Sequence, residues 1–260
     1  MITPPVRGGM PELGRALEAA ERAGRAVMDV YRTEFEHDTK ADGSPVTGAD
    51  LASNQVIREM LEGSGHRILS EEDADDGSRL GERTLWIVDP LDGTSDFVDR
   101  TGEFTVMIAL VRDGRPILGV IGWPDGGELY AAQKGAGAFR YSGGRWEGIR
   151  ASDAGEIGRS KAVGSRHHLS EREKEAMARL GVGSFEGVGS SLKACRIACG
   201  EADLYFTYTD KMCEWDSAAS SCIVAEAGGD DHRYKRRHDH VQPQRCEASG
   251  RDGHEQRRPA

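Results

Sequence analysis

The 260-residue sequence has few of the features that mark a membrane, nucleic-acid-binding or disulfide-stabilised protein. No apolar run approaches the roughly 18 residues that a membrane-spanning helix needs, and the N-terminus has no apolar stretch typical of a signal peptide. The formal net charge of −10 argues against a basic surface for long nucleic acid. The five cysteines include no CxxC pair, which is typical of free thiols in a reducing compartment. We therefore expect a cytoplasmic protein without a membrane or long nucleic-acid partner.

The hydrophobic pattern is that of a mixed globular fold. It predicts helices over 10–36, 50–62, 170–181 and 214–229, with a Ser170–Glu173 capping box before the third. It predicts strands over 67–73, 83–89 and 161–165, and a strand followed by a glycine turn over 127–139. It also predicts a hairpin turning at Asp113-Gly114 within 104–123 and a helix followed by a strand over 189–208. Segments 37–50 and 141–156 are polar or turn-rich and are predicted as loops. This mixture predicts a layered α+β or α/β architecture.

The stretch WIVDPLDGTSDF (86–97) places carboxylates at the end of an apolar strand. Pro90 removes a backbone donor and Gly93 permits a tight turn, so Asp89 and Asp92 can point into one cleft. Uncompensated, these charges repel each other and resist burial. A divalent cation resolves that cost, and oxygen ligands suit Mg²⁺.

Three further segments present acids at element boundaries: Glu71-Glu72 ends a predicted strand, and Asp50 and Asp216 each open a predicted helix. Sites are typically assembled from such positions. Two simpler interpretations stay open, because Asp216 alone is typical of a helix N-cap and Glu71-Glu72 of a solvated acidic turn.

Thr94 and its neighbours extend the cluster of acids toward catalysis. A threonine hydroxyl bonded to an acid can orient a water, and the backbone N–H groups of Gly93, Thr94 and Ser95 can hold a phosphate if a helix begins there. Metal ions, a positioned water and a phosphate cradle together favour hydrolytic phosphoryl transfer.

Three motifs in order, SEE (70–72), WIVDPLDGTSDF (86–97) and EWDSAASSCIVAEAGG (214–229), resemble those of the inositol monophosphatase superfamily of Mg²⁺-dependent, lithium-sensitive phosphatases. The resemblance implies an αβαβα sandwich that binds two or three Mg²⁺ ions and is inhibited by Li⁺. It implies metal ligation by the carboxylates of Glu71, Asp89, Asp92 and Asp216 and by the main-chain carbonyl of Leu91.

The same resemblance implies that Asp50 and Thr94 activate the nucleophilic water, with Glu71 helping through its metal. Gly93, Thr94 and Ser95 correspond to the phosphate-holding turn, and Asp216 also faces the substrate. Lys40 resembles a mobile-loop lysine near the third metal position, although a solvated loop lysine is an equally simple interpretation.

The segments GEFTVMIALVRDGRPILGVIGWP, GSRHHLS, GSSLKACRIACGEADLY and MCEWDSAA are most similar to the CysQ-type branch of 3'(2'),5'-bisphosphate nucleotidases. This implies hydrolysis of adenosine 3',5'-bisphosphate to AMP and phosphate by a metal-activated water. Ser190, Ser191 and Lys193 would then contact the substrate's phosphate or sugar, and Arg166 and His168 its second phosphate. Alternatively, the last two are simply exposed ahead of the helix capped by Ser170.

Other functions remain open at this point. An inositol-1-phosphate or fructose-1,6-bisphosphate phosphatase would carry the same metal site, and a non-enzymatic relative would bind metal or a partner without turnover. Dimers are frequent in the family, so a homodimer is one assembly to test.

The composition predicts three regions. Residues 1–145 form an N-terminal α+β domain with most metal ligands, and 146–229 form a C-terminal α/β domain that completes the site and substrate pocket. Residues 230–260 are an atypical polar tail, disordered or frame-shifted, that lacks the family's closing elements. Asp96 is a smaller departure, at a position where the family commonly has Asn or Glu.

Overall fold

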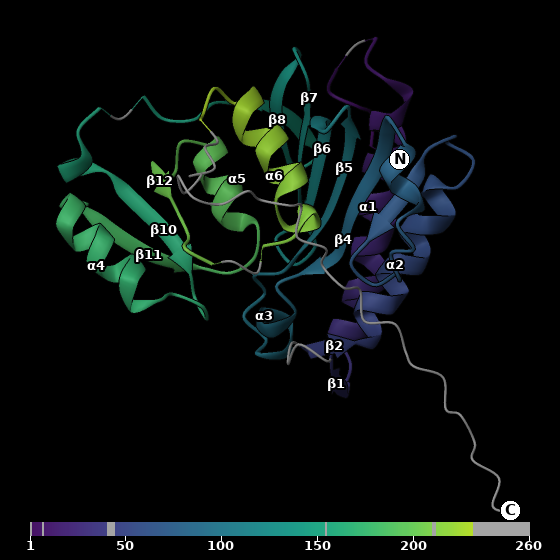
Figure 1. Cartoon of the computed structure of the whole chain (residues 1–260), viewed down its shortest axis with the longest axis horizontal. Coiled ribbons are helices and arrows are strands. Elements are labelled where there is room, and N and C mark those ends of the chain that lie inside the picture. The colour runs from purple at the N-terminus through teal and green to yellow at the C-terminus, as the bar shows by residue number, and fades with distance from the viewer. Residues whose placement is uncertain (1, 7, 41–44, 154, 210–211, 231–260) are drawn as a thin grey trace, which may run out of the picture.

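The computed structural model describes residues 2–6, 8–40, 45–153, 155–209 and 212–230. The tail predicted over 230–260 lies, apart from Asp230, outside these residues. The described part of the chain forms a large sheet, a small sheet and the helices that cover them (Figure 1).

The large sheet has seven strands in the order β3-β4-β5-β6-β7-β8-β9, with β3 parallel to β4 and every other neighbouring pair antiparallel. The strands are β3 (Arg67–Ser70), β4 (Thr84–Asp92), β5 (Thr105–Arg112), β6 (Arg115–Trp123), β7 (Glu128–Gln133), β8 (Gly137–Ser142) and β9 (Arg145–Ile149). Both faces are covered, which explains the continuous apolar run in β5. Val106, Ile108 and Leu110 enter one core, and Met107 and Ala109 enter the other.

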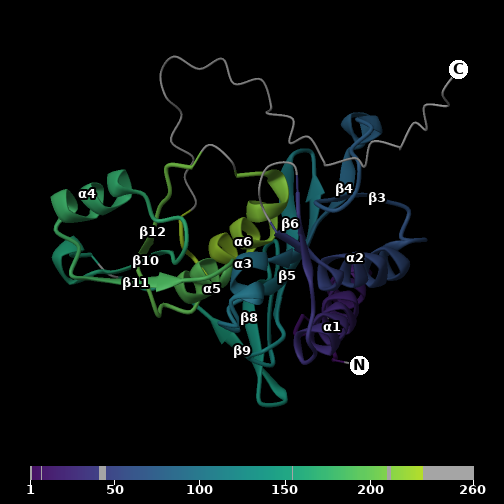
Figure 2. The same ribbon diagram turned by 90° about the horizontal axis from the view of Figure 1, so that it is seen from below.

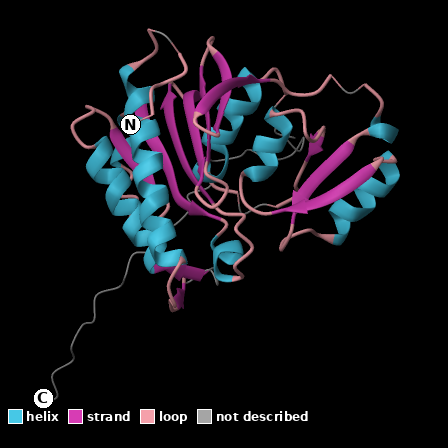
Figure 3. Cartoon of the chain, turned by 180° about the vertical axis from the view of Figure 1, so that it is seen from behind, coloured by secondary structure: helices cyan, strands magenta, loops and turns pink. Residues whose placement is uncertain are grey.

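Helices α1 (Pro11–Tyr31) and α2 (Gly48–Leu61) pack on one face of this sheet, and α6 (Glu214–Glu226) packs on the other with α5 (Leu192–Ala198) beside it. Beyond α5 lie the parallel small sheet β11-β10-β12 and, outermost, α4 (Glu171–Leu180), as Figures 1 and 2 show. The small sheet consists of β10 (Lys161–Ser165), β11 (Ser184–Val188) and β12 (Leu204–Tyr205). Figure 3 shows the same layers from behind. The predicted layered αβαβα fold is confirmed.

Several local predictions are also confirmed. Asp113 and Gly114 both have positive φ (51° and 72°), as a two-residue hairpin turn requires. Ser170 and Glu173 form the predicted capping box of α4. Cys195, Cys199 and Cys222 are free thiols as predicted, whereas the prediction is wrong for Cys213, which is disulfide-bonded. Within the described residues, no helix is both long and apolar enough to span a membrane.

Three predicted boundaries are wrong. The first helix ends at Tyr31, not at residue 36, and the predicted loop 37–50 contains the short hairpin of β1 (His37–Thr39) and β2 (Pro45–Thr47) and the start of α2. The predicted loop 141–156 contains the end of β8 and all of β9. These strands are recognisable by main-chain pairing across the Gly143-Gly144 turn and not by apolar alternation. The large sheet therefore continues to Ile149, past residue 145 where the sequence placed a domain boundary.

Candidate active site

Asp89 and Asp92 lie at the end of β4, where the pairing with β5 shifts register between them. Pro90 has no N–H to give to the ladder, so the strand bulges here. The Ser53 hydroxyl on α2 donates to the Pro90 carbonyl (2.6 Å), and the Leu91 N–H donates to Asp89 Oδ1 (3.1 Å). Asp89 is only 1% exposed. The bulge therefore turns two carboxylates inward within four residues.

Two helix N-termini bring further acids. Asp50 is the third residue of α2, and its Oδ2 accepts from the Thr47 N–H and hydroxyl, both at 2.7 Å. Asp216 is the third residue of α6, and its Oδ2 accepts from the Cys213 N–H (2.6 Å). Asp216 thus satisfies the helix N-terminus, as the simpler interpretation held, but the N-cap itself is Cys213. In each capping box, only one carboxylate oxygen is used.

The four predicted metal-ligating carboxylates influence one another electrostatically. Burial, and then the charges of Glu71, Asp92 and Asp216, raise the pKa of Asp89 well above its usual range. Burial raises the pKa of Asp216 to about 7, with Asp92 and Glu71 adding to the rise. Burial also raises the pKa of Asp92 and of Glu71. Such a set is stabilised in its ionised form by positive charge and by hydrogen bonds to its oxygens.

Lys40 provides part of that charge. Its ammonium lies 2.8 Å from Glu71 Oε1 and 2.5 Å from Glu72 Oε1, and its side chain is 9% exposed. Burial alone would lower the pKa of Lys40, but contact with Glu71 and Glu72 outweighs it and raises the pKa. The structure therefore contradicts both simpler interpretations, the solvated loop lysine and the solvated acidic turn.

The donor set fits a hard divalent cation, since it consists of carboxylate and carbonyl oxygens. Among the described residues, however, no three acidic, histidine or cysteine side chains are already arranged as a finished metal site. Glu71 is paired with Lys40 instead, whose ammonium lies 2.8 Å from Oε1.

Thr94 contacts Asp50, the other member of the water-activating pair that the sequence predicts. Its hydroxyl donates to Asp50 Oδ1 (3.1 Å) and also lies 3.2 Å from the Leu91 carbonyl. Helix α3 (Thr94–Val98) begins at this residue, and Gly93 before it has a φ of 89°. The first N–H groups of a helix have no partner within it, so those of Thr94 and Ser95 are available beside the acids.

The turn between β11 and α5 lies against this region from the other half of the chain. The Ser191 N–H donates to Asp92 Oδ2 (2.5 Å), and the Lys193 ammonium donates to the Ser190 carbonyl (2.5 Å). A Cβ on Gly93 would come within 2.9 Å of Ser190 Cβ, so only glycine permits this close approach. The predicted substrate-side residues Ser190, Ser191 and Lys193 therefore do reach the cluster of acids.

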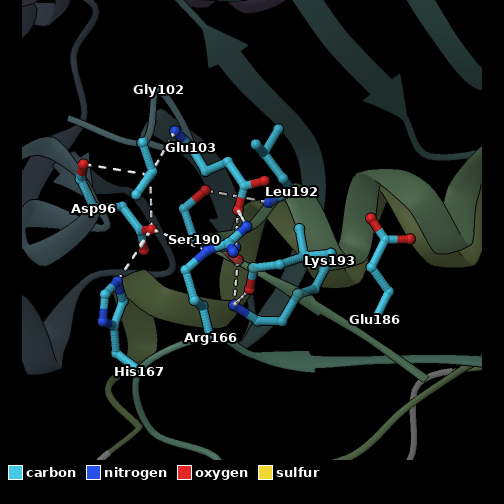
Figure 4. Close-up of polar contacts among 12 residues, drawn as sticks. Asp96, Gly102, Glu103, Arg166, His167, Glu186, Ser190, Leu192 and Lys193 are labelled. Atoms are coloured by element: carbon cyan, nitrogen blue, oxygen red, sulfur yellow. Dashed lines mark hydrogen bonds and ion pairs between the residues drawn. The ribbon is translucent and has the colours of Figure 1, made fainter. Parts of the chain in front are cut away.

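Arg166 and His168 are placed differently (Figure 4). Arg166 Nη2 lies 2.7 Å from Glu103 Oε2, and its Nε lies 3.6 Å from Asp96 Oδ1. His167, not His168, contacts Asp96, with Nε2 3.2 Å from Oδ1. His168 is exposed, and its main-chain N–H donates to Ser165 Oγ (3.0 Å). The contact of Arg166 and His168 with a second phosphate stays a prediction.

A profile of the inositol monophosphatase family matches residues 12–259. The chain belongs to this family.

The chain is similar to two CysQ proteins and to a histidinol-phosphatase. The 3'(2'),5'-bisphosphate nucleotidase CysQ of Escherichia coli K12 is 39% identical over 228 residues, which cover 86% of this chain and 91% of that protein. The crystal structure of CysQ from Bacteroides thetaiotaomicron, a bacterial member of the family, has a TM-score of 0.74 and 37% identity, and the match covers 84% of this chain and 86% of that one. A histidinol-phosphatase of Chlorobaculum parvum is 34% identical over 84% of both chains.

Sequence reasoning missed several residues of this family member's site. Four of them contact a predicted site residue or the turn that carries one: Thr47, Ser53, Glu103 and Thr105. The fifth is His167, which contacts Asp96, whereas the sequence predicts a role for its neighbour His168. For Thr47, the T-x-x-D spacing before α2 was an available signal. Nothing in the sequence indicated the other contacts, which join segments 13 to 86 residues apart.

Proposed function

We propose that this protein is a Mg²⁺-dependent phosphomonoesterase that hydrolyses the 3'-phosphate of adenosine 3',5'-bisphosphate, giving AMP and phosphate. The observation that carries the reaction type is the buried cluster of Glu71, Asp89, Asp92 and Asp216 beside the Thr94–Asp50 pair. The substrate rests on similarity to the CysQ nucleotidases over most of the chain.

The four carboxylates of this cluster and the Leu91 carbonyl would hold two or three Mg²⁺ ions, with Li⁺ as an inhibitor. When bound, Mg²⁺ lowers the pKa of a water and offsets the negative charge of the phosphate. The Lys40 ammonium, which pairs with Glu71, adds further positive charge at the edge of the cluster.

Asp50 and Thr94 would handle the proton of the attacking water. The Thr47 capping contacts fix Asp50 Oδ2, which leaves Oδ1 to accept the Thr94 hydroxyl proton. The lone pairs of Thr94 Oγ1 then face away from Asp50 and can accept from the water. Burial raises the pKa of Asp50, which makes it a better proton acceptor than an exposed aspartate.

The phosphate would lie against the N–H groups at the start of α3, provided by Gly93, Thr94 and Ser95, with Asp216 opposite. Ser190, Ser191 and Lys193 would face the rest of the substrate, and Arg166 and His168 its second phosphate. For Arg166 this requires the phosphate to share a guanidinium that already pairs with Glu103.

A substrate panel with Mg²⁺ tests the proposal: adenosine 3',5'-bisphosphate, inositol 1-phosphate, fructose 1,6-bisphosphate and histidinol phosphate. We expect the bisphosphate nucleotide to have a kcat/KM at least about tenfold higher than the others, since a site that pairs with a substrate's polar groups discriminates against analogues that lack them. Equal rates on inositol 1-phosphate would contradict the nucleotidase assignment. Absence of Mg²⁺-dependent phosphate release from all four would favour the non-enzymatic alternative.

We further propose that the protein acts in the cytoplasm on a small phosphorylated substrate; the three free thiols support the location, and the net charge of −10 argues against long nucleic acid as the partner. We also propose that the protein forms a homodimer. Light scattering, which gives the mass of the assembly in solution, tests this.

A further inference from the structure

Glu103 joins the two halves of the chain at a point that no catalytic assignment uses. Its Oε2 accepts from the Gly189 N–H (2.6 Å). The same oxygen pairs with Arg166 Nη2 (2.7 Å), and Figure 4 shows these two side chains together. We call this three-residue contact the Glu103 bridge; the Glu103 side chain is 18% exposed and the Arg166 side chain 40%, so the bridge is shielded on its Glu103 side and open to water on its Arg166 side. Hydrogen bonds to a charged acceptor in such a setting are among the stronger ones.

The backbone packs just as closely around this bridge. A Cβ on Gly189 would lie 2.6 Å from Asp96 Oδ2 and 2.8 Å from the Glu103 carbonyl, and one on Gly93 would lie 3.1 Å from that same carbonyl. Three segments, 93–96, 102–104 and 189–191, therefore meet without room for a side chain. The position of the 189–191 turn is fixed relative to the end of β4.

The 189–191 turn also holds Asp92, a predicted metal ligand, in place. Asp92 Oδ2 accepts from the Ser191 N–H (2.5 Å) and from the Thr105 hydroxyl (3.3 Å), while Ser191 Oγ lies 2.7 Å from Thr105 Oγ1. With Oδ2 held from two sides, Oδ1 remains to ligate. Ser190 has a φ of 48°, a conformation that a serine adopts only when its surroundings hold it there.

We propose that Glu103 is a positioning residue that holds the 189–191 turn, so that Ser191 orients Asp92 for metal binding. In this role Arg166 acts as the partner of Glu103, and a contact with the substrate's second phosphate would come in addition to that pair. The inference rests on the proposed metal-dependent function, because it assigns a purpose to the orientation of Asp92.

The first test measures metal binding without turnover. Mg²⁺ titrations of the melting temperature give the metal affinity of wild type, Glu103→Ala, Glu103→Gln and the control Glu82→Ala, which removes a carboxylate from the exposed Arg67–Glu82 pair. We expect about tenfold weaker Mg²⁺ binding in Glu103→Ala, as for lost outer contacts of metal ligands. Glu103→Gln keeps an oxygen for the Gly189 N–H and should lose less, and Glu82→Ala should match wild type.

The second test separates positioning from substrate contact. Arg166→Ala and Arg166→Lys are compared on adenosine 3',5'-bisphosphate and on p-nitrophenyl phosphate, which has one phosphate. We expect Arg166→Ala to raise the Mg²⁺ concentration for half-maximal rate by a similar factor on both, with partial rescue by Lys.

Unchanged Mg²⁺ affinity in both Glu103 variants would overturn the proposal, as would an Arg166→Ala effect confined to KM for the bisphosphate. If wild type releases no phosphate from any substrate, the proposed function fails, whereas the melting titrations still decide whether Glu103 governs metal binding.

Discussion

The acids of the site and the Glu103 bridge differ in how far apart in the sequence their contacting residues lie. Asp89, Asp50 and Asp216 are each fixed by a main-chain N–H two or three residues away. The Glu103 bridge joins residues 63 and 86 apart in the sequence. The first group is therefore built into single turns and helix starts, while the second exists only after the two halves of the chain have packed together. Three substitutions test this difference, from the largest expected effect to the smallest.

Asp92→Asn should have the largest effect, because it removes a predicted metal-ligating charge that lies between the two groups. We expect kcat to fall at least about a hundredfold, more than outer contacts usually cost, with Mg²⁺ binding weakened in parallel. Asp113→Asn, a matched change in the hairpin turn between β5 and β6, should leave both unchanged. Full activity of Asp92→Asn at wild-type Mg²⁺ concentration would remove Asp92 from the metal site.

Thr94→Ala should have an intermediate effect that is confined to the chemical step. Because Thr94 contacts Asp50 and is not a predicted metal ligand, the variant should keep the Mg²⁺ affinity of wild type while kcat falls about a hundredfold, the usual range for a lost proton-transfer group. Thr94→Ser, which retains the hydroxyl, is the control and should recover most of the rate. An unchanged kcat in Thr94→Ala would contradict the role in water activation.

Ser170→Ala should have the smallest effect and should change stability alone. Ser170 caps α4, which lies in the outermost layer, so its loss should cost about 1 kcal/mol in the free energy of unfolding, as for other N-caps. Although burial opposes it, hydrogen bonds from Ser170 and Tyr208 lower the pKa of Glu173. The stability contributed by Glu173 is thus present at neutral pH and is lost as the pH falls below the usual range for glutamate.

Urea unfolding of wild type and Ser170→Ala at pH 7 and pH 3 checks both statements. The difference between the two proteins should shrink at pH 3, because Glu173 takes up protons as the pH falls below the usual range for glutamate. An undiminished difference at pH 3 would show that the cap acts independently of Glu173, and a loss of kcat would show that α4 influences the site.

This difference in sequence separation also explains which features the sequence could predict. The acid at the end of a strand and the acid three residues into a helix are visible locally, so Asp89, Asp92, Asp50 and Asp216 were all named, together with the layered fold. The hairpin β1-β2 and strand β9 were not, because short strands without apolar alternation depend on their pairing partners. The pair of Arg166 with Glu103 could not be predicted, because nothing near Arg166 in the sequence indicates Glu103.

Product analysis of adenosine 3',5'-bisphosphate incubated with the wild-type protein tests the central claim most directly. Chromatography and a phosphate assay, each with Mg²⁺ and with a chelator, identify the nucleotide formed and its dependence on metal. The account predicts AMP with the phosphate on the 5' carbon and one equivalent of phosphate, formed only with Mg²⁺. Adenosine 3'-phosphate as the product, or equal release in the presence of the chelator, would contradict it.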